Sequence, residues 1–384
     1  MYAVTHINVF NGSTIEADQA IFIDGDTITD VLPMSQVNQN QRLPEQCFDG
    51  SGLLATAGFI DIQINGCGGV LLNTDIAKST LDTMNATNLR HGTTQYLPTF
   101  ITSETAPFQQ VIQLIESIRQ PEKEGILGLH LEGPFISKKK KGAHREDCIR
   151  DLDENTARDL ASHAHRIKVI TLAPEACDQH VIDILTDAGI IVSMGHTNGQ
   201  YADYASKHGM TMATHLFNAM SPLDSREPGA VGYIFDKKPH AGIIVDGIHV
   251  NYASVRIAHE ILGEKLFMVT DAVTPAGTEM KEYDMAGTRA YVTDGKCHYA
   301  DGTIAGAAIT MIEGVRNLIR HVGLSTEEAL RMATLYPAKA LGLSEQYGRI
   351  QTGYKANLAL LNDDLQVISA VQMGQLHSFS SSAT

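Results

Sequence analysis

Short segments near the start of the chain alternate apolar and polar residues. Residues 6–10 and 20–24 follow this pattern, and the turn signals Asn11-Gly12 and Asp24-Gly25-Asp26 bound them. A side-chain period of two residues between such turns is typical of antiparallel strands. We therefore predict that the first fifty residues contribute strands to a sheet.

Similar strand-like segments occur near the other end of the chain, at 357–361 and 366–371. The termini of a domain usually lie at its surface and often close together. We therefore predict a small β-sandwich domain formed by residues 1–54 and 345–384. Residues 55–344 would then form a larger domain inserted between its two halves.

The inserted region alternates apolar runs with helix-like stretches. The clearest helical faces consist of Phe108, Val111, Ile112, Ile115 and Ile118, and of Val181, Ile182 and Leu185. The candidate strands are 59–65, 93–98, 126–132, 167–172, 190–196, 211–215, 241–246 and 266–271. This α/β alternation predicts a TIM-like (β/α)8 barrel, with a doubly wound open sheet as the alternative.

The composition of the chain indicates which classes of partner can be expected. The chain has 384 residues with 29 Lys and Arg against 44 Asp and Glu, so its formal net charge is −15. Nucleic-acid affinity depends on clustered basic residues, so we expect no nucleic-acid partner. No apolar run reaches the roughly 18 residues of a membrane span, so we expect no membrane partner either. Five widely separated cysteines are typical of a reduced, cytoplasmic protein.

Polar residues stand at the ends of the predicted strands, where the active site of such a barrel lies. Glu132, His196 and His215 each end a different strand, and two imidazoles with one carboxylate are a common catalytic zinc set. We predict these three as metal ligands. Asp271, at the end of the last strand, is then free to act as general base on the water that the metal activates.

Each of these residues alone has an ordinary structural explanation. A single buried histidine is more often a hydrogen-bonded core residue than a ligand, and Asp271 alone could cap a following helix. The coincidence of chemistry-bearing residues at several predicted strand ends favours a site. His130 shares a strand face with Glu132, and we expect it to lie deeper in the barrel with a structural role.

Several motifs recur in the order known from one family. They are Gly58-Phe-Ile-Asp-Ile-Gln-Ile-Asn-Gly-Cys-Gly-Gly69, His130-Leu-Glu-Gly-Pro134, Gly195-His-Thr-Asn198, Thr214-His-Leu-Phe-Asn-Ala-Met220, Asp246-Gly-Ile-His249 and Val269-Thr-Asp-Ala272. The chain resembles the N-acetylglucosamine-6-phosphate deacetylases of the amidohydrolase superfamily over nearly its whole length. The resemblance implies hydrolysis of N-acetyl-D-glucosamine 6-phosphate to D-glucosamine 6-phosphate and acetate, in amino-sugar catabolism.

The resemblance implies the same ligands and the same catalytic acid/base, Asp271. It also implies substrate contacts that spacing does not reveal. These are Ala143, His144, Asn218, Ala219, Arg226, Asp246, Gly247, Ile248, His249, Ile304, Ala305 and Gly306. Arg226 is similar to the arginine that binds the substrate phosphate from the neighbouring subunit, which implies a homodimer or homotetramer.

Two positions distinguish this chain within the superfamily. Gln63-Ile-Asn65 stands where many amidohydrolases carry His-x-His, and amides are poor zinc ligands, so we expect one divalent cation per subunit, with Zn²⁺ as the expected ion. Ile304-Ala-Gly306 stands where the family often has Leu-Ser-Gly, so a hydroxyl contact is not expected there. N-acetylgalactosamine 6-phosphate or a cyclic amide stays open as substrate. A non-catalytic scaffold would be expected to have lost ligands, which this chain retains.

Overall fold

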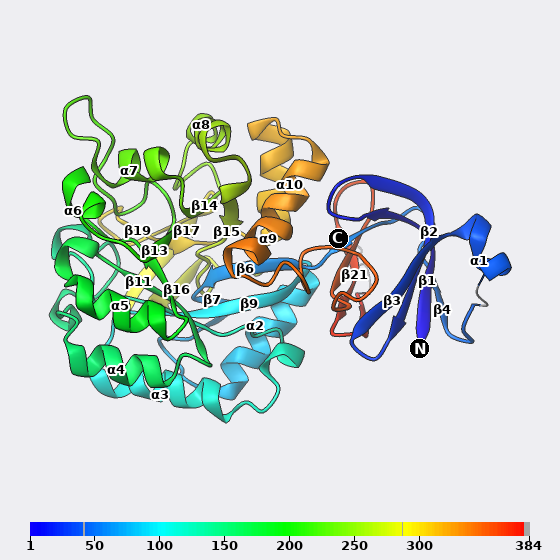
Figure 1. Ribbon diagram of the computed structural model, residues 1–384, viewed down its shortest axis with the longest axis horizontal. Coiled ribbons are helices and arrows are strands. Elements are labelled where there is room, and N and C mark those ends of the chain that lie inside the picture. Colours follow the sequence, from blue (N-terminus) through cyan, green and yellow to red (C-terminus); the bar gives the residue numbers. More distant parts are fainter. Residues whose placement is uncertain (41–42, 286, 380–384) are drawn as a thin grey trace.

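The protein consists of a large α/β body and a smaller β-body beside it (Figure 1). The computed structural model describes residues 1–40, 43–285 and 287–379, so residues 380–384 of the predicted terminal domain lie outside the described part. Both ends of the described chain belong to the smaller body (Figure 1). The limits 1–54, 55–344 and 345–384 remain our proposal for where the two domains divide.

The smaller body is a sheet made from both ends of the chain. Its strands, apart from β4, follow the order β22-β21-β20-β5-β1-β2-β3, and β4 pairs with β1. Their bounds are β1 (Tyr2–Phe10), β2 (Ile15–Asp24), β3 (Thr27–Pro33), β4 (Cys47–Asp49), β5 (Leu54–Ala57), β20 (Leu358–Leu361), β21 (Val367–Gln372) and β22 (Gln375–Ser378). The helix α1 (Met34–Asn40) follows β3. Apolar side chains of β1, β2, β5 and β20 share one buried cluster, which is the core of this body.

The larger body is built on eight strands in the order β15-β14-β13-β12-β11-β10-β9-β6, and all their pairings are parallel. Their bounds are β6 (Phe59–Ile64), β9 (Thr93–Ile101), β10 (Leu129–Glu132), β11 (Ile167–Leu172), β12 (Ile191–Met194), β13 (Met210–Ala213), β14 (His240–Ile244) and β15 (Leu266–Val269). Each overlaps a predicted strand. The (β/α)8 barrel is therefore confirmed, and the open-sheet alternative is wrong.

Side chains and main chain together close the barrel between its first and last strands. The Thr270 hydroxyl donates a hydrogen bond to Asp61, and the main-chain N–H of Asp271 donates to the Gln63 carbonyl at 2.9 Å. Asp61 is fully buried, and this burial raises the pKa of its carboxyl to about 7. The closure matters for function because it places the end of β15 against β6.

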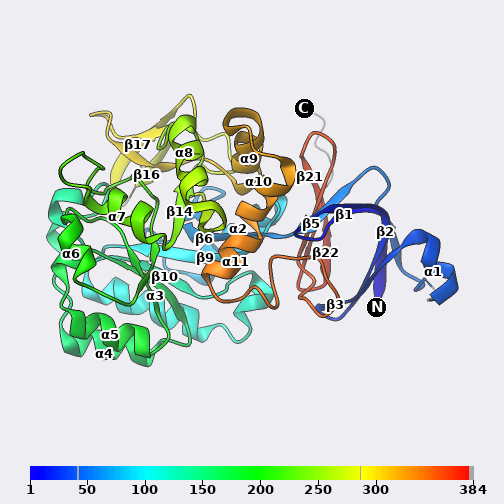
Figure 2. The same ribbon diagram turned by 45° about the horizontal axis from the view of Figure 1, so that its top comes forward.

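Helices cover the outside of the barrel and follow its strands in sequence (Figures 1 and 2). Their bounds are α2 (Lys78–Arg90), α3 (Thr105–Ser117), α4 (Glu154–Ser162), α5 (Gln179–Asp187), α6 (Tyr201–Ala205), α7 (Gly229–Lys237), α8 (Tyr252–Leu262), α9 (Met311–Asn317), α10 (Thr326–Ala333) and α11 (Leu335–Ala340). The apolar face predicted around Phe108 is buried in α3, and the face around Ile182 is buried in α5. None of the helices described is long and apolar enough to cross a membrane.

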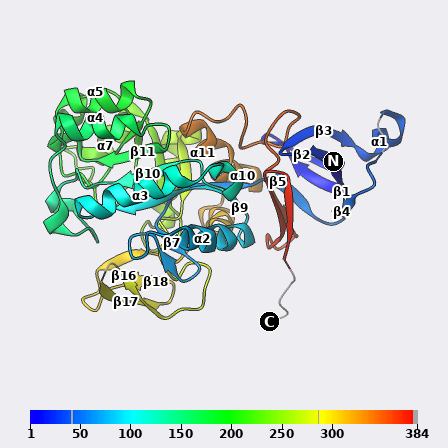
Figure 3. The same ribbon diagram turned by 90° about the horizontal axis from the view of Figure 1, so that it is seen from below.

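A four-stranded antiparallel sheet, which the sequence analysis did not predict, is inserted after β15. It consists of β16 (Glu282–Met285), β17 (Thr288–Thr293), β18 (Lys296–His298) and β19 (Ile304–Ala307). Asp294-Gly295 forms the turn between β17 and β18, and this dipeptide is a strong hairpin signal that could have revealed the sheet. The sheet lies on the same side of the barrel as the small hairpin of β7 (Gly66–Cys67) and β8 (Val70–Leu71), as Figure 3 shows.

Candidate active site

Three of the predicted residues meet at the mouth of the barrel. Oε1 of Glu132 lies 2.9 Å from Nε2 of His215 and 3.2 Å from Nε2 of His196. The two Nε2 atoms are 3.0 Å apart. All three side chains are buried. The structure therefore brings the predicted ligands together, although they come from three strands and span more than eighty positions of sequence.

The backbone aims these side chains into the barrel. Glu132 is the last residue of β10, but β12, β13 and β15 end two residues before His196, His215 and Asp271. These three residues have φ values of 47°, 32° and 49°. Residues other than glycine rarely adopt this left-handed region, and strained backbone of this kind is concentrated at functional sites. The strained turn at three strand ends directs each side chain towards the same point.

The hydrogen bonding around His196 shows what the cluster can hold. Nδ1 of His196 lies 2.8 Å from the carbonyl oxygen of Lys140, which can only accept, so Nδ1 carries the proton. Nε2 of the neutral ring then presents a lone pair towards Glu132, whose carboxylate is also an acceptor. Two acceptors facing each other favour a cation between them, and a carbonyl partner behind a ligating histidine is the usual arrangement at metal sites. The donor set fits a divalent ion.

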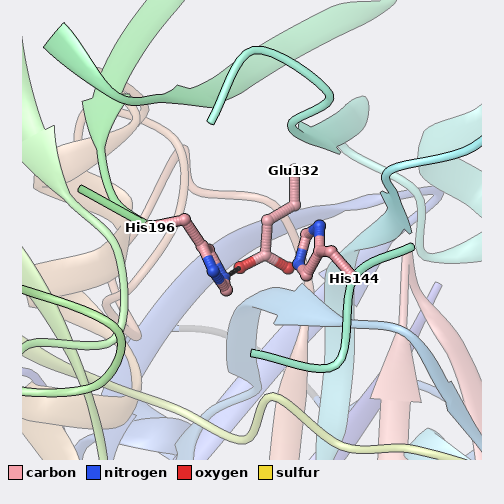
Figure 4. A group of neighbouring side chains, drawn as sticks. All are labelled: Glu132, His144 and His196. Carbon is pink, nitrogen blue, oxygen red and sulfur yellow. Dashed lines mark hydrogen bonds and ion pairs between the residues drawn. The ribbon is translucent and has the colours of Figure 1, made fainter. Parts of the chain in front are cut away.

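His144 lies beside this cluster and is a further candidate ligand. Glu132, His144 and His196 each offer one ligand atom, and these atoms lie within 4.8 Å of one another. Figure 4 shows the carboxylate of Glu132 between the two rings. Nδ1 of His144 is 2.6 Å from the Thr102 hydroxyl, a partner that the sequence analysis missed. His215 is placed at least as well to complete the set, because its Nε2 approaches Glu132 Oε1 to 2.9 Å and His196 Nε2 to 3.0 Å.

Asp271 occupies the same cavity but has a different set of partners. Asn65 Nδ2 donates to its Oδ1 at 2.8 Å, and Gln63 Nε2 lies 3.3 Å from the same oxygen. Gln63 Nε2 also donates to Glu132 Oε1 at 2.9 Å. Burial and the nearby Glu132 charge raise the pKa of Asp271 to about 6. In contrast, the two imidazoles beside it, His196 and His215, outweigh burial and hold the pKa of Glu132 well below its usual value.

A further histidine, His249, lines the cavity from the segment that follows β14. Nδ1 of His249 is 2.6 Å from Oδ2 of Asp246, and Oδ1 of Asp246 accepts the main-chain N–H groups of Ile248 and His249 at 2.8 Å each. These bonds oppose the effect of burial and lower the pKa of Asp246. Asp246 therefore fixes the orientation of the His249 ring, and the ring is the member of this pair that lines the cavity.

The cavity has a volume of about 340 Å³. The predicted residues that line it are Glu132, Ala143, His144, His196, His215, Asn218, Ala219, His249, Asp271, Ile304 and Gly306. The predicted residues outside this lining are Arg226, Asp246, Gly247, Ile248 and Ala305. Lining residues that the sequence analysis did not propose are Asn65, Ile101, Gly142, Val273, Met285 and Thr303. Met285 and Thr303 belong to the inserted sheet region, whose existence was not predicted.

Arg226 lies on an exposed loop between β13 and α7. Its main-chain N–H donates to Asp224, and its side chain makes no hydrogen bond to any residue that lines the cavity. Among the described residues of that lining, none is a lysine or an arginine. An anion in this cavity therefore meets no guanidinium or ammonium group among these lining residues.

His130 and Cys67 stand apart from the cavity lining. His130 is buried below Glu132, with Nδ1 2.9 Å from the Ile62 carbonyl and Nε2 2.7 Å from the Thr171 hydroxyl. Burial lowers the pKa of this ring to about 4. Both ring nitrogen atoms of His130 therefore have hydrogen-bond partners inside the barrel. Cys67 is buried in the β7–β8 hairpin, and burial raises the pKa of its thiol, which is the opposite of what a nucleophile requires.

Comparison with known proteins gives the family. Residues 54–378 match the model of the amidohydrolase family. The chain belongs to the amidohydrolase family. Members of this family are enzymes, and the buried Glu and His side chains at the barrel mouth are consistent with the divalent metal that the family typically binds.

Relatives match the chain along most of its length. It is 39% identical to the N-acetylglucosamine-6-phosphate deacetylase of Haemophilus influenzae, over 97% of this chain and 98% of that protein. It is 34% identical to an N-acetylgalactosamine-6-phosphate deacetylase of a Shewanella species, over 85% of this chain and 83% of that protein.

Solved structures show the same architecture. The N-acetylglucosamine-6-phosphate deacetylase of Pasteurella multocida matches with a TM-score of 0.94 and 41% identity, over 98% of this chain and all of that chain. An Asp→Ala mutant of the Mycobacterium smegmatis enzyme, in complex with N-acetyl-D-glucosamine-6-phosphate, matches with a TM-score of 0.88 and 28% identity, over 98% of both chains.

Proposed function

We propose that this amidohydrolase converts N-acetyl-D-glucosamine 6-phosphate and water into D-glucosamine 6-phosphate and acetate. The observation that carries the proposal is that one cavity contains both a cluster of three possible metal ligands and a separate carboxylate. Glu132, His196 and His215 converge within 3.2 Å of one another, and Asp271 stands apart with its own hydrogen-bond donors. The relatives and solved structures named above support the choice of substrate.

Glu132, His196 and His215 would hold one divalent ion. An ion bound there supplies Lewis acidity, which lowers the pKa of water and polarises a carbonyl oxygen. We propose Zn²⁺ because tetrahedral sites with two imidazoles and one carboxylate are common for this ion. Gln63 and Asn65 are occupied with hydrogen bonds to carboxylates, which supports one ion per subunit.

Asp271 performs the proton transfers in the proposed reaction. It takes a proton from the water that attacks the acetamide carbonyl, and it later gives that proton to the departing amine. A raised pKa suits a group that must act first as base and then as acid. His144 or His249 donates a hydrogen bond to the developing oxyanion, since both rings line the cavity.

Phosphate recognition is proposed to involve a second copy of the chain. A phosphate ester carries about two negative charges near neutral pH, and guanidinium groups bind it with paired hydrogen bonds. The cavity lining described above contains no such group, whereas Arg226 is exposed and is available to a neighbour. We therefore propose a homodimer, or a homotetramer made of such pairs, in which Arg226 reaches the neighbouring site.

Mixing two inactive variants tests this arrangement. Arg226→Ala and Asp271→Asn subunits would form mixed dimers in which one site has Asp271 of its own and Arg226 of its neighbour. Activity should reappear on mixing and subunit exchange. If Arg226 serves its own subunit, no intact site forms and the mixture stays inactive. Arg158→Ala, an exposed arginine on α4, is the matched control for Arg226→Ala.

The function itself is tested by following acetate release from N-acetyl-D-glucosamine 6-phosphate, with and without a chelator. We expect release in the untreated enzyme, loss after chelation and recovery when a divalent ion is added. The second candidate substrate is N-acetyl-D-galactosamine 6-phosphate, which the Shewanella relative favours. Comparing kcat/KM for the two sugars decides between them, and no acetate from either sugar would contradict the proposed reaction.

We also propose that the enzyme acts in the cytoplasm in amino-sugar catabolism. All five cysteines are free thiols in the structure, which is the pattern expected in a reducing compartment. Its only expected partners are the phosphosugar and further copies of the chain.

A further inference from the structure

Two buried amide side chains converge on one oxygen of Asp271. Asn65 Nδ2 donates to Oδ1 at 2.8 Å, and Gln63 Nε2 lies 3.3 Å from the same atom. Both amides come from β6 or from the residue just after it, and both are at most 3% exposed. Asp271 itself follows β15, so these contacts join the first and last strands of the barrel.

The two oxygens of this carboxylate are held differently. Oδ1 has both amide donors, whereas no described residue donates a hydrogen bond to Oδ2. The main chain at Asp271 is also fixed by β6, because its N–H donates to the Gln63 carbonyl at 2.9 Å while its φ is 49°. The strained residue is therefore held at its backbone and at one carboxylate oxygen by the same neighbouring strand.

We propose that Gln63 and Asn65 are positioning residues that anchor Oδ1 of Asp271 and leave Oδ2 as the oxygen that takes and returns the proton. This inference rests on the proposed function, in which Asp271 is the base. A general base must lie within hydrogen-bond reach of the proton that it removes, so a freely rotating carboxylate would lose rate. Two donors on one oxygen prevent that rotation.

The choice of amides follows from their chemistry. A carboxamide N–H remains a donor at all ordinary pH values and carries no net charge. It can therefore orient Asp271 without neutralising it. Gln63 also bonds Glu132 Oε1, so the same side chain sets the spacing between the base and one proposed ligand. Among the described residues, the side-chain amide of Asn65 donates to Asp271 alone, which makes Asn65 the better position for a test.

The test replaces Asn65 by Leu, which removes the donor at similar volume, and by Asp, which keeps the shape but cannot donate when ionised. We expect kcat to fall by roughly 10–100-fold in both variants, as is typical when a supporting partner of a catalytic group is removed. KM should change by less than about threefold, because the amide does not hold the sugar. Each purified variant should retain the parent's metal content.

Gln95→Leu is the matched control. Gln95 is a buried amide on β9, and its Nε2 lies 3.2 Å from the Glu122 carbonyl and 3.3 Å from Asn357 Oδ1. Its loss should lower Tm, as the loss of a buried hydrogen bond does, while kcat stays at the parent value. A fall in kcat of equal size in this control would overturn the inference, since it would reflect general destabilisation.

A double-mutant cycle supplies a readout that needs no activity. The shifts in Tm caused by Asn65→Leu and Asp271→Ala should fail to add in the double variant, because both remove the same contact. Additive shifts, an unchanged kcat in both Asn65 variants, a changed KM alone or a loss of metal would each overturn the inference. A parent enzyme that releases no acetate would contradict only the proposed function, and the cycle would then decide the positioning role.

Discussion

The two sides of the barrel mouth differ in the partners that surround their carboxylates. On the side of β10, β12 and β13, Oε1 of Glu132 and the Nε2 atoms of His196 and His215 lie within 3.2 Å of one another. On the side of β6 and β15, Asp271 receives neutral donors from Gln63 and Asn65. The first side favours a cation for its stability, whereas on the second side hydrogen bonds already hold one oxygen of the carboxylate.

This difference separates the two carboxylates by role. The pKa of Glu132 is held low by its imidazole partners, and the pKa of Asp271 is raised to about 6 by burial and by the charge of Glu132. Paired carboxylates whose environments move their pKa values apart commonly divide the tasks of charge stabilisation and proton transfer. Glu132 suits a permanent negative ligand, and Asp271 suits a group that changes protonation during turnover.

The largest effects are expected on the ligand side. His215→Ala should lower the bound metal to a small fraction of the parent's and reduce acetate release below detection, because one of three protein ligands is gone. His144→Ala is the matched comparison, since His144 also lies beside Glu132. We expect this second variant to keep its metal. Metal analysis of both purified proteins checks the assignment, and the reverse result would make His144 the third ligand.

Asp271→Asn should leave metal content intact and lower kcat by about 10²–10⁴-fold, the usual range for a lost general base. The amide keeps the size of the side chain but cannot accept the proton. Steady-state kinetics and metal analysis on one preparation are sufficient. Turnover close to that of the parent would show that another group is the base.

A smaller loss is expected from Thr102→Val, which removes the hydroxyl 2.6 Å from Nδ1 of His144 while keeping the side-chain volume. The ring would be free to rotate, and we expect kcat to fall by roughly tenfold or more with metal retained. Thr186→Val on α5 is the control, because its hydroxyl bonds only carbonyls of its own helix. If the two variants had equal kcat values, the orientation of the His144 ring would not matter for turnover.

The smallest effect on catalysis is expected away from the mouth, at Glu328 on α10. Hydrogen bonds with His259, Arg331 and Tyr336 outweigh burial and lower the pKa of this carboxyl to about 2. Because the folded pKa lies below the ordinary 4.5, the contribution to stability is present above that pH and declines as the pH falls towards 2.

Glu328→Gln should therefore lower the unfolding free energy at pH 7 by about 2 kcal/mol, with kcat unchanged. The difference from the parent should shrink as the pH falls from about 5 towards 2, because over this range Glu328 is protonated in the unfolded chain while it stays ionised in the folded protein. Urea unfolding at several pH values measures it. If the difference in unfolding free energy did not change with pH, the loss of stability would not come from the charge of Glu328. Glu154→Gln, in an exposed pair with Arg158, is the control.

Local patterns were sufficient to predict the barrel, because each strand is a short apolar run between helices. Their limits were less predictable. The run 126–132 was predicted as one strand, but β10 begins at Leu129, since Gly128 adopts a φ of 142° and interrupts the run. Strand ends at His196, His215 and Asp271 are likewise two residues shorter, because the chain turns there to present the side chain.

Residue type and position at a strand end were sufficient to predict which side chains lie at the candidate site, but not the contacts between them. The contacts that organise it join distant parts of the chain: Thr102 with His144, and Asn65 with Asp271, which are 206 positions apart. No periodicity signals such a pair. The same holds for the wall supplied by Met285 and Thr303, because it depends on how the inserted sheet folds back over the barrel mouth.

The most direct measurement is anomalous X-ray diffraction from crystals of the enzyme grown with its native metal. The account predicts one anomalous peak per subunit, about 2.0–2.2 Å from Nε2 of His196, from Nε2 of His215 and from a carboxylate oxygen of Glu132. It predicts no second peak beside Gln63 and Asn65. A peak bonded to Asp271 or Asn65, or no peak in a fully active preparation, would contradict it.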